Sequence, residues 1–200
     1  MDGSLERVRY VLVASVPREV EVLIEDAYLH LAGSTRPLMG YHVTLLGPFY
    51  LLGDSPLDAL PGLAEVCGAT RPFDLVATGM GAFHAGDTHT VYLSAGEGPQ
   101  PDALHWALVE ALHDDVEMCN EHVRVWNLEG YKPHITLGMN LTDQELDAFM
   151  TLGLVREPEI RFTVNQISLV QEALNGLWQH VACYPLGATA DDLCDEDDAG

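Results

Sequence analysis

The chain has 200 residues, of which 48% are hydrophobic, and its 9 Lys and Arg stand against 31 Asp and Glu for a formal net charge of −22. This length and apolar content predict one globular domain and exclude a disordered acidic protein. The negative charge disfavours binding to a long nucleic acid track or to an anionic membrane. Lys132 is the only lysine among the nine cations.

The ends and the cysteines indicate a compartment. No basic region followed by a long apolar run stands at the N-terminus, and no stretch of 18 apolar residues occurs, so we expect neither a signal peptide nor a membrane span. The four cysteines fit no zinc pattern, and we expect free buried thiols in a cytoplasmic monomer without cofactors. Residues 188–200 carry six acidic residues and no apolar period, which predicts a disordered tail after a single domain over 1–187.

The first half of the chain predicts alternating strands and helices. In order, we expect a strand at 9–16, a helix from Pro17 to Gly33-Ser34, a strand at 42–49, a helix from Ser55-Pro56 to about Cys67, and a hairpin of 73–78 with 88–95. The hairpin loop is glycine-rich, with Gly79, Gly81 and Gly86.

The second half of the chain also predicts a mixture of helices and strands. We expect a helix at 101–116, strands at 122–126 and 133–139, a helix to about 152 after the capping box that starts at Thr142, and a closing hairpin of 160–172 with 177–186 around Asn175-Gly176. Strands and helices are mixed without strict alternation, which predicts an α+β fold with a mostly antiparallel sheet.

One short pattern occurs twice, 92 residues apart. His42-Val43-Thr44-Leu45 and His134-Ile135-Thr136-Leu137 both fall within predicted strands. Side chains of a strand alternate between faces, so the His and Thr of each copy point the same way. If the two strands lie together, two imidazoles and two hydroxyls converge. Alternatively, each histidine is a core residue bonded to a neighbouring hydroxyl.

Such a convergence suits phosphate chemistry without a metal. One neutral histidine can accept a proton from the attacking group while a protonated one gives a proton to the leaving oxygen. Threonine hydroxyls can donate to the non-bridging phosphate oxygens. His84, Asp87 and His89 are a possible but incomplete metal set, so we expect no metal.

The paired motifs resemble those of the 2H phosphoesterase superfamily, which contains the 2′-5′ RNA ligase and RNA 2′,3′-cyclic phosphodiesterase proteins. Leu45-Leu46-Gly47-Pro48-Phe49 and Tyr131-Lys132-Pro133 resemble the family's flanking sequences, and the likeness runs from about Arg9 to Leu186. The resemblance implies two pseudo-symmetric α/β lobes around a central cleft, each lobe giving one motif strand. It also implies that His42 and His134 are the acid–base pair and that Thr44 and Thr136 bind the phosphate.

Neighbouring residues are candidates for substrate contacts. Lys132 lies two positions before His134 and can offset phosphate charge. Tyr131 and Tyr41 are candidates for phosphate or base contacts, although a core position is the simpler explanation. Phe49, Phe83 and Trp126 are candidates for stacking on a nucleobase.

The sequence therefore predicts a metal-independent phosphodiesterase. Its expected substrates are small nucleotides, oligonucleotides or RNA ends, with 2′,3′-cyclic phosphates or 2′,5′-type linkages, because an acidic body does not bind a long RNA track. Two alternatives remain open. One is a non-catalytic module that binds a small nucleotide or RNA end, and the other is an RNA 2′-5′ ligase.

Overall fold

A computed structural model of the chain describes residues 7–52, 60–156, 159–173 and 176–187. The expected acidic tail at 188–200, the helix start at Ser55-Pro56 and the turn residue Asn175 lie outside the described residues. The expected single domain over 1–187 stays a prediction.

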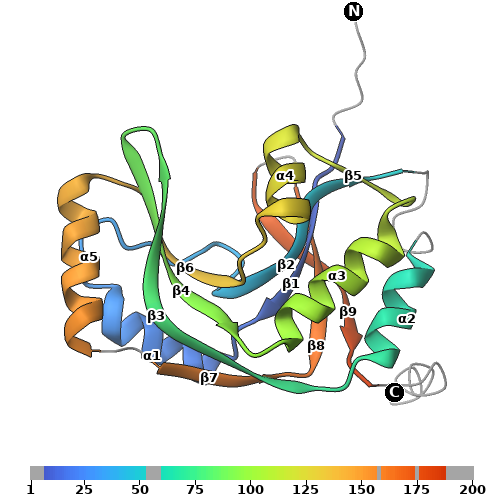
Figure 1. The fold of residues 1–200 in the computed structure, drawn as a ribbon, viewed down its shortest axis with the longest axis horizontal. Coiled ribbons are helices and arrows are strands. Elements are labelled where there is room, and N and C mark those ends of the chain that lie inside the picture. The colour runs from blue at the N-terminus through green and yellow to red at the C-terminus, as the bar shows by residue number, and fades with distance from the viewer. Residues whose placement is uncertain (1–6, 53–59, 157–158, 174–175, 188–200) are drawn as a thin grey trace, which may run out of the picture.

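The described strands form one antiparallel sheet, which curls strongly (Figure 1). Its nine strands are β1 (Tyr10–Ser15), β2 (His42–Leu51), β3 (Phe73–Ala85), β4 (Thr88–Glu97), β5 (Val116–Met118), β6 (His134–Leu141), β7 (Glu159–Val164), β8 (Gln166–Glu172) and β9 (Trp178–Pro185). Their order is β7-β3-β4-β6-β2-β1-β8-β9, and β5 pairs with β2. The expected α+β fold with a mostly antiparallel sheet is confirmed.

Helices lie at both ends of the sheet (Figure 1). The described ones are α1 (Arg18–Tyr28), α2 (Pro61–Ala69), α3 (Gln100–Leu112), α4 (Glu121–Glu129) and α5 (Asp143–Arg156). Helices α2 and α3 pack against each other at one end, whereas α5 packs on β3, β4 and β6 at the other. Among the described residues, no helix has the length and apolar character needed to cross a membrane.

The sheet divides into two halves of four strands around its centre. We call β2-β1-β8-β9 the first half and β6-β4-β3-β7 the second half. The motif strands β2 and β6 are the inner strand of each half and pair with each other. The described strands thus form one continuous sheet, and the expected arrangement of two pseudo-symmetric lobes stays a prediction.

Both faces of strand β1 are apolar. Leu12 and Ala14 of β1 point into the main core, which alternate side chains of most strands share. Val11 and Val13, on the opposite face, form a small cluster with Val170 and the partly buried Met39 and Trp178. This second cluster makes part of the face away from the main core apolar.

Several expectations about secondary structure are wrong. The helices expected to reach Gly33-Ser34 and residue 116 end at Tyr28 and Leu112, and Val116 begins strand β5, which was not expected. Residues 122–126 lie in helix α4, which begins where the Asn120 side chain accepts a hydrogen bond from the Val123 amide at 3.0 Å. Gly79 and Gly81 lie inside β3, which continues to the turn at Gly86. Residues 160–172 form two strands, β7 and β8, which pair in opposite halves of the sheet.

Candidate active site

The two repeated motifs lie side by side at the centre of the sheet. Strands β2 and β6 are antiparallel, with Val43 opposite Ile135. This register places His42 near Thr136 and Thr44 near His134, because residues on either side of a paired position face each other in an antiparallel ladder. Val43 and Ile135 are completely buried, whereas the four motif side chains are partly exposed on the other face.

Both motif histidines are held in the same way. Nδ1 of His42 lies 2.8 Å from the carbonyl oxygen of Gly40, and Nδ1 of His134 lies 2.7 Å from the carbonyl oxygen of Lys132. A carbonyl oxygen only accepts, so each ring carries its proton on Nδ1 when neutral. The Nε2 atom of each ring is then left with a lone pair for a proton or a ligand.

The strands next to the motifs repeat this arrangement. Ser15 of β1 is opposite His42, and Ser94 of β4 is opposite His134. The residue before each histidine accepts a backbone hydrogen bond through its carbonyl oxygen, Tyr41 from the Val16 amide and Pro133 from the Ala95 amide, both at 2.9 Å. The duplication therefore extends beyond the three-residue motif to the strands that hold it.

A cavity of about 520 Å³ opens beside the motifs. His42, Thr44 and Thr136 line it together with an apolar wall that includes Met39 and Trp178. Arg36 is the only arginine or lysine among the described residues that line this cavity, and its side chain is 49% exposed. Arg36 was not predicted from the sequence, because nothing in the motif pattern marks a loop residue that precedes the strand.

Aromatic rings surround His134. The ring centroids of Phe83, Tyr92 and Trp126 lie 5.0, 5.2 and 6.0 Å from the His134 centroid. Phe83 and Tyr92 also stack on each other across the β3–β4 hairpin. Phe83 and Trp126, expected to stack on a base, thus lie next to a motif histidine. Tyr92 was missed, although it lies within a strand already assigned to the hairpin.

Burial sets the protonation of both histidines. It lowers the pKa of His42 and of His134 below the ordinary histidine value, because a partly dry site disfavours the charged ring. The bonds to Gly40 and Lys132 oppose this effect. The charges of His134 and His180 lower the pKa of His42 further. Both rings therefore favour the neutral form in the absence of an anion.

Tyr131 is engaged by protein contacts. Its ring stacks on His105 with centroids 3.6 Å apart, and its hydroxyl donates to the carbonyl oxygen of Thr44 at 3.1 Å. His105 is completely buried, and its ring nitrogens lie 2.6 and 2.7 Å from the carbonyl oxygens of Leu45 and Asn127. Through its hydroxyl, Tyr131 connects the segment before β6 to β2, and since it stays partly exposed, the expected substrate contact remains a prediction.

Phe49 and Tyr41 are core residues. Phe49 has no exposed surface and stacks on Tyr10, so it does not reach a substrate, contrary to expectation. Strict alternation from His42 already puts position 49 on the opposite face, which is the signal that could have excluded it. Tyr41 is likewise buried. Lys132 is exposed and lies just before β6, where its carbonyl oxygen holds His134.

The histidines of the β3–β4 hairpin form a short chain of hydrogen bonds. Nδ1 of His84 lies 2.8 Å from Nδ1 of His89, whose Nε2 lies 2.8 Å from Asp143 Oδ1 at the start of α5. Asp87, which the sequence placed beside them, is not part of this chain. Among the described residues, no group of three His, Cys, Asp or Glu side chains is arranged to hold a metal ion.

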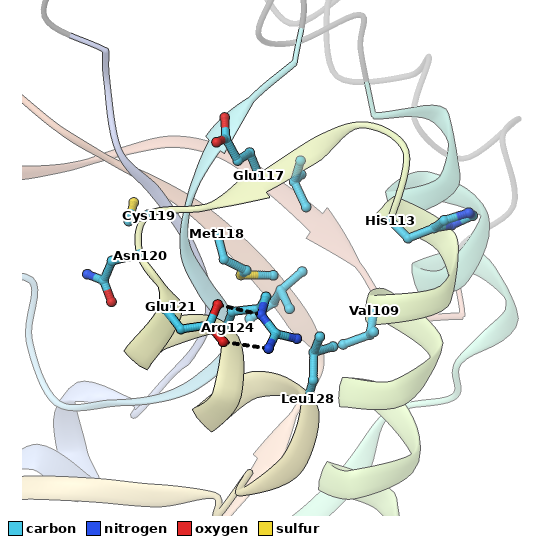
Figure 2. A pocket seen from close by; sticks show the side chains of 11 residues that line it. Val109, His113, Glu117, Met118, Cys119, Asn120, Glu121, Arg124 and Leu128 are labelled. Carbon is cyan, nitrogen blue, oxygen red and sulfur yellow. Dashed lines mark hydrogen bonds and ion pairs between the residues drawn. The ribbon is translucent and has the colours of Figure 1, made fainter.

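A second cavity, of about 480 Å³, shares no residue with the first. It lies between α3, β5 and α4, with an ion pair of Arg124 and Glu121 at 2.6 Å on its rim (Figure 2). The partly exposed Cys119 also lines it. Cys67, Cys119 and Cys183 are free thiols, but only Cys67 is buried, so the expectation of buried thiols holds for one of the three described cysteines.

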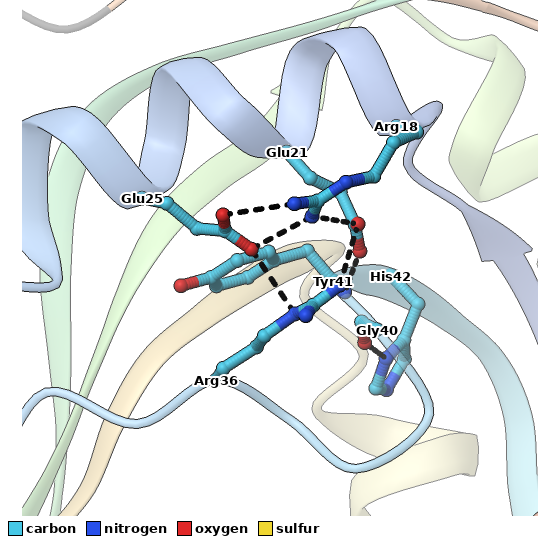
Figure 3. A network of polar contacts seen from close by, with 7 residues as sticks. All are labelled: Arg18, Glu21, Glu25, Arg36, Gly40, Tyr41 and His42. Atoms are coloured by element: carbon cyan, nitrogen blue, oxygen red, sulfur yellow. Dashed lines mark hydrogen bonds and ion pairs between the residues drawn. The ribbon is translucent and has the colours of Figure 1, made fainter.

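An ion network joins helix α1 to the loop that leads into β2 (Figure 3). On α1, Glu21 and Glu25 both pair with Arg18 and with Arg36. Glu21 Oε1 also accepts a hydrogen bond from the Tyr41 amide at 2.8 Å. The network thus connects helix α1 both to the cavity wall and to the residue before His42.

Comparisons with known proteins agree with this fold. No curated protein matches the sequence. TT0787 of Thermus thermophilus is similar in structure, with a TM-score of 0.60, 20% identity and coverage of 90% of this chain and 98% of that chain. Escherichia coli LigT complexed with 3′-AMP has a TM-score of 0.58 and 17% identity, covering 92% of this chain and 100% of that chain. The family model of the 2′-5′ RNA ligase superfamily matches residues 16–176, so the chain belongs to this superfamily, as the motif resemblance implied.

Proposed function

We propose that the chain is a metal-independent phosphodiesterase that opens 2′,3′-cyclic phosphates or cleaves 2′,5′-type linkages in small nucleotides, oligonucleotides or RNA ends. The pairing of Val43 with Ile135 is the observation that carries the proposal, because it brings both His–Thr pairs to one face of the sheet. His42 and His134 then act as the acid–base pair.

The threonines and the nearby cations serve the phosphate. Thr44 and Thr136 donate hydrogen bonds to its non-bridging oxygens, whose charge grows in the transition state. The exposed Lys132 contributes positive charge from the second half, and Arg36, whose charge is paired with Glu21 and Glu25, offers further N–H donors from the cavity wall. Local cations matter in this protein, because the formal net charge of the chain is −22.

The substrate is small and contains a nucleoside. A nucleobase can pack against the apolar cavity wall that includes Met39 and Trp178. A second nucleobase can stack on the aromatic rings of Phe83 and Trp126 near His134. Structures of LigT complexed with 3′-AMP, ATP, NADP+ and phosphate support small nucleotides as the ligand class. We propose a soluble cytoplasmic monomer as the working form.

The experiment is hydrolysis of a 2′,3′-cyclic nucleotide in buffer with EDTA, followed by detection of the opened nucleotide. We expect turnover that EDTA does not reduce. If the nucleotide binds in a thermal-shift assay but no product forms, the proposal of an enzyme is wrong and a binding module is supported. Turnover that stops in EDTA and returns with an added divalent ion would overturn the metal-independent mechanism.

A further inference from the structure

We infer that Glu21 is a positioning residue for His42 and acts through a single peptide group. This inference rests on the proposed function for its catalytic meaning, although the geometry that carries it does not. Glu21 lies on helix α1 with a side chain that is only 8% exposed. A carboxylate is costly to bury unless donors surround it, so its partners indicate what it holds in place.

Among the described residues, three groups donate to Glu21. They are the Tyr41 amide at 2.8 Å, Arg18 Nη1 at 2.9 Å and Arg36 Nη2 at 3.3 Å. The arginines compensate its charge, and the amide gives it a fixed point on the chain. That amide belongs to the peptide bond between Gly40 and Tyr41, directly before the first motif.

The same peptide bond holds His42 from its other side. The Gly40 carbonyl oxygen accepts the hydrogen bond from His42 Nδ1 at 2.8 Å, while the Tyr41 N–H of that peptide points to Glu21 (Figure 3). The order is therefore carboxylate, peptide group, imidazole. A peptide group is planar, so fixing its N–H also fixes the direction of its carbonyl. Hydrogen bonds in such a chain also strengthen one another.

Gly40 shows how closely these groups approach. Its φ is +78°, and a Cβ added there would lie 2.7 Å from Glu21 Oε1. A side chain at position 40 would thus meet both backbone strain and the carboxylate itself. The loop is shaped so that this peptide lies against Glu21.

In the second half, the peptide group that bonds the motif histidine needs no carboxylate. His134 is held by the carbonyl oxygen of Lys132, and the next residue is Pro133, which has no N–H. No acceptor is needed there. Only the first half must satisfy a buried amide at this position, which gives Glu21 a role that His134 does not require.

Glu25 is the matched control. It lies one helical turn after Glu21 and pairs with the same two arginines, at 2.8 Å for Arg18 and 3.0 Å for Arg36. The Tyr41 amide donates to Glu21 and not to Glu25. A change at Glu25 therefore disturbs the ion network while leaving the hydrogen bond from the Tyr41 amide to Glu21 in place.

The test separates geometry from charge with three variants. Glu21→Gln removes the charge but keeps an oxygen for the Tyr41 amide, Glu21→Asp keeps the charge but withdraws the oxygens by one methylene, and Glu25→Gln is the control. We expect Glu21→Asp to lower kcat by about 10- to 100-fold and the other two variants to stay within about threefold of wild type.

A spectroscopic readout accompanies the kinetics. Nitrogen NMR of the histidine rings is expected to show a lost or shifted Nδ1–H signal of His42 in Glu21→Asp, with the His134 signal unchanged. If Glu21→Gln is impaired and Glu21→Asp resembles wild type, charge alone matters and the inference is wrong. It is equally wrong if the His42 signal stays constant in Glu21→Asp. A wild-type protein without turnover would overturn the proposed function, while the ring signals would still decide the role of Glu21.

Discussion

The two motif strands hold their histidines alike but surround them differently. In both halves, Nδ1 is bonded to the carbonyl oxygen two residues earlier and a serine stands opposite the histidine. His42 lines the cavity with Arg36 and Met39, whereas His134 is enclosed by aromatic rings. The shared part fixes where Nε2 can act. Under the proposed function, these different surroundings give the two copies of the motif unequal roles.

The largest expected effect tests whether both halves are needed. Replacing His42 or His134 by alanine removes one of the two proton-transfer groups, so each variant should lower kcat by about 10²- to 10⁴-fold. His113→Ala is the control, because His113 is exposed and lines only the second cavity. Hydrolysis of a 2′,3′-cyclic nucleotide is the measurement. Full activity in either motif variant would refute the acid–base pair.

The next effect tests whether the threonines are equivalent. Thr44→Ala and Thr136→Ala each remove one hydroxyl donor from the phosphate, and kcat/KM should fall by about 100-fold in both. Thr44→Ser and Thr136→Ser keep a hydroxyl and should recover most of the activity. Steady-state kinetics of the four variants make the comparison. A loss confined to one half would show that the duplication serves only folding in the other.

A smaller effect should appear in the pH dependence of one half. Burial lowers the pKa of His134, and Phe83 contributes one of the rings that enclose it. Phe83→Ala admits water, which favours the charged imidazole, so the pKa of His134 should rise toward its ordinary value. NMR titration of the ring carbons measures this directly. The pKa of His42 should move much less, and an equal rise in both would contradict the separate environments.

The smallest effect concerns stability in acid. Both motif histidines have a lower pKa in the folded chain than in the unfolded chain. Below about pH 6.5, the unfolded chain therefore binds more protons at these two residues than the folded chain does. The free energy of unfolding should therefore decrease as the pH falls below about 6.5. Above about pH 6.5 these two histidines should add no pH dependence to it. Denaturant unfolding of wild type and of a variant with His42→Gln and His134→Gln should differ in this slope. Parallel pH curves would contradict it.

Local patterns predicted much of this molecule. The motif residues were identified by their repetition, and strand alternation predicted that the His and Thr of each copy share a face. The capping box at Thr142 is present, with Glu145 accepting from the Thr142 amide at 2.8 Å. The strand expected at 122–126 is instead part of helix α4. There Asn127 fixes a helix by bonding the buried amide and carbonyl of Gly47, a contact 80 residues away.

Tertiary pairing explains the other failures. No local signal near Asn165 shows that β7 joins the second half and β8 the first, because that choice depends on partners far away in the sequence. Arg36 and Glu21 were missed for the same reason. Their roles come from a loop and a helix that meet beside β2, and neither residue belongs to a recognisable motif.

The most direct measurement of the central claim is a phosphate titration observed at both motif histidines. If His42 and His134 face one anion site, the Nε2 signals of both rings should shift together and follow one saturation curve, because a bound anion favours the charged form of each. His113, which lines the second cavity and not the first, should not respond in this range. Movement of only one motif histidine, or two curves with different midpoints, would contradict a single site formed by the two halves.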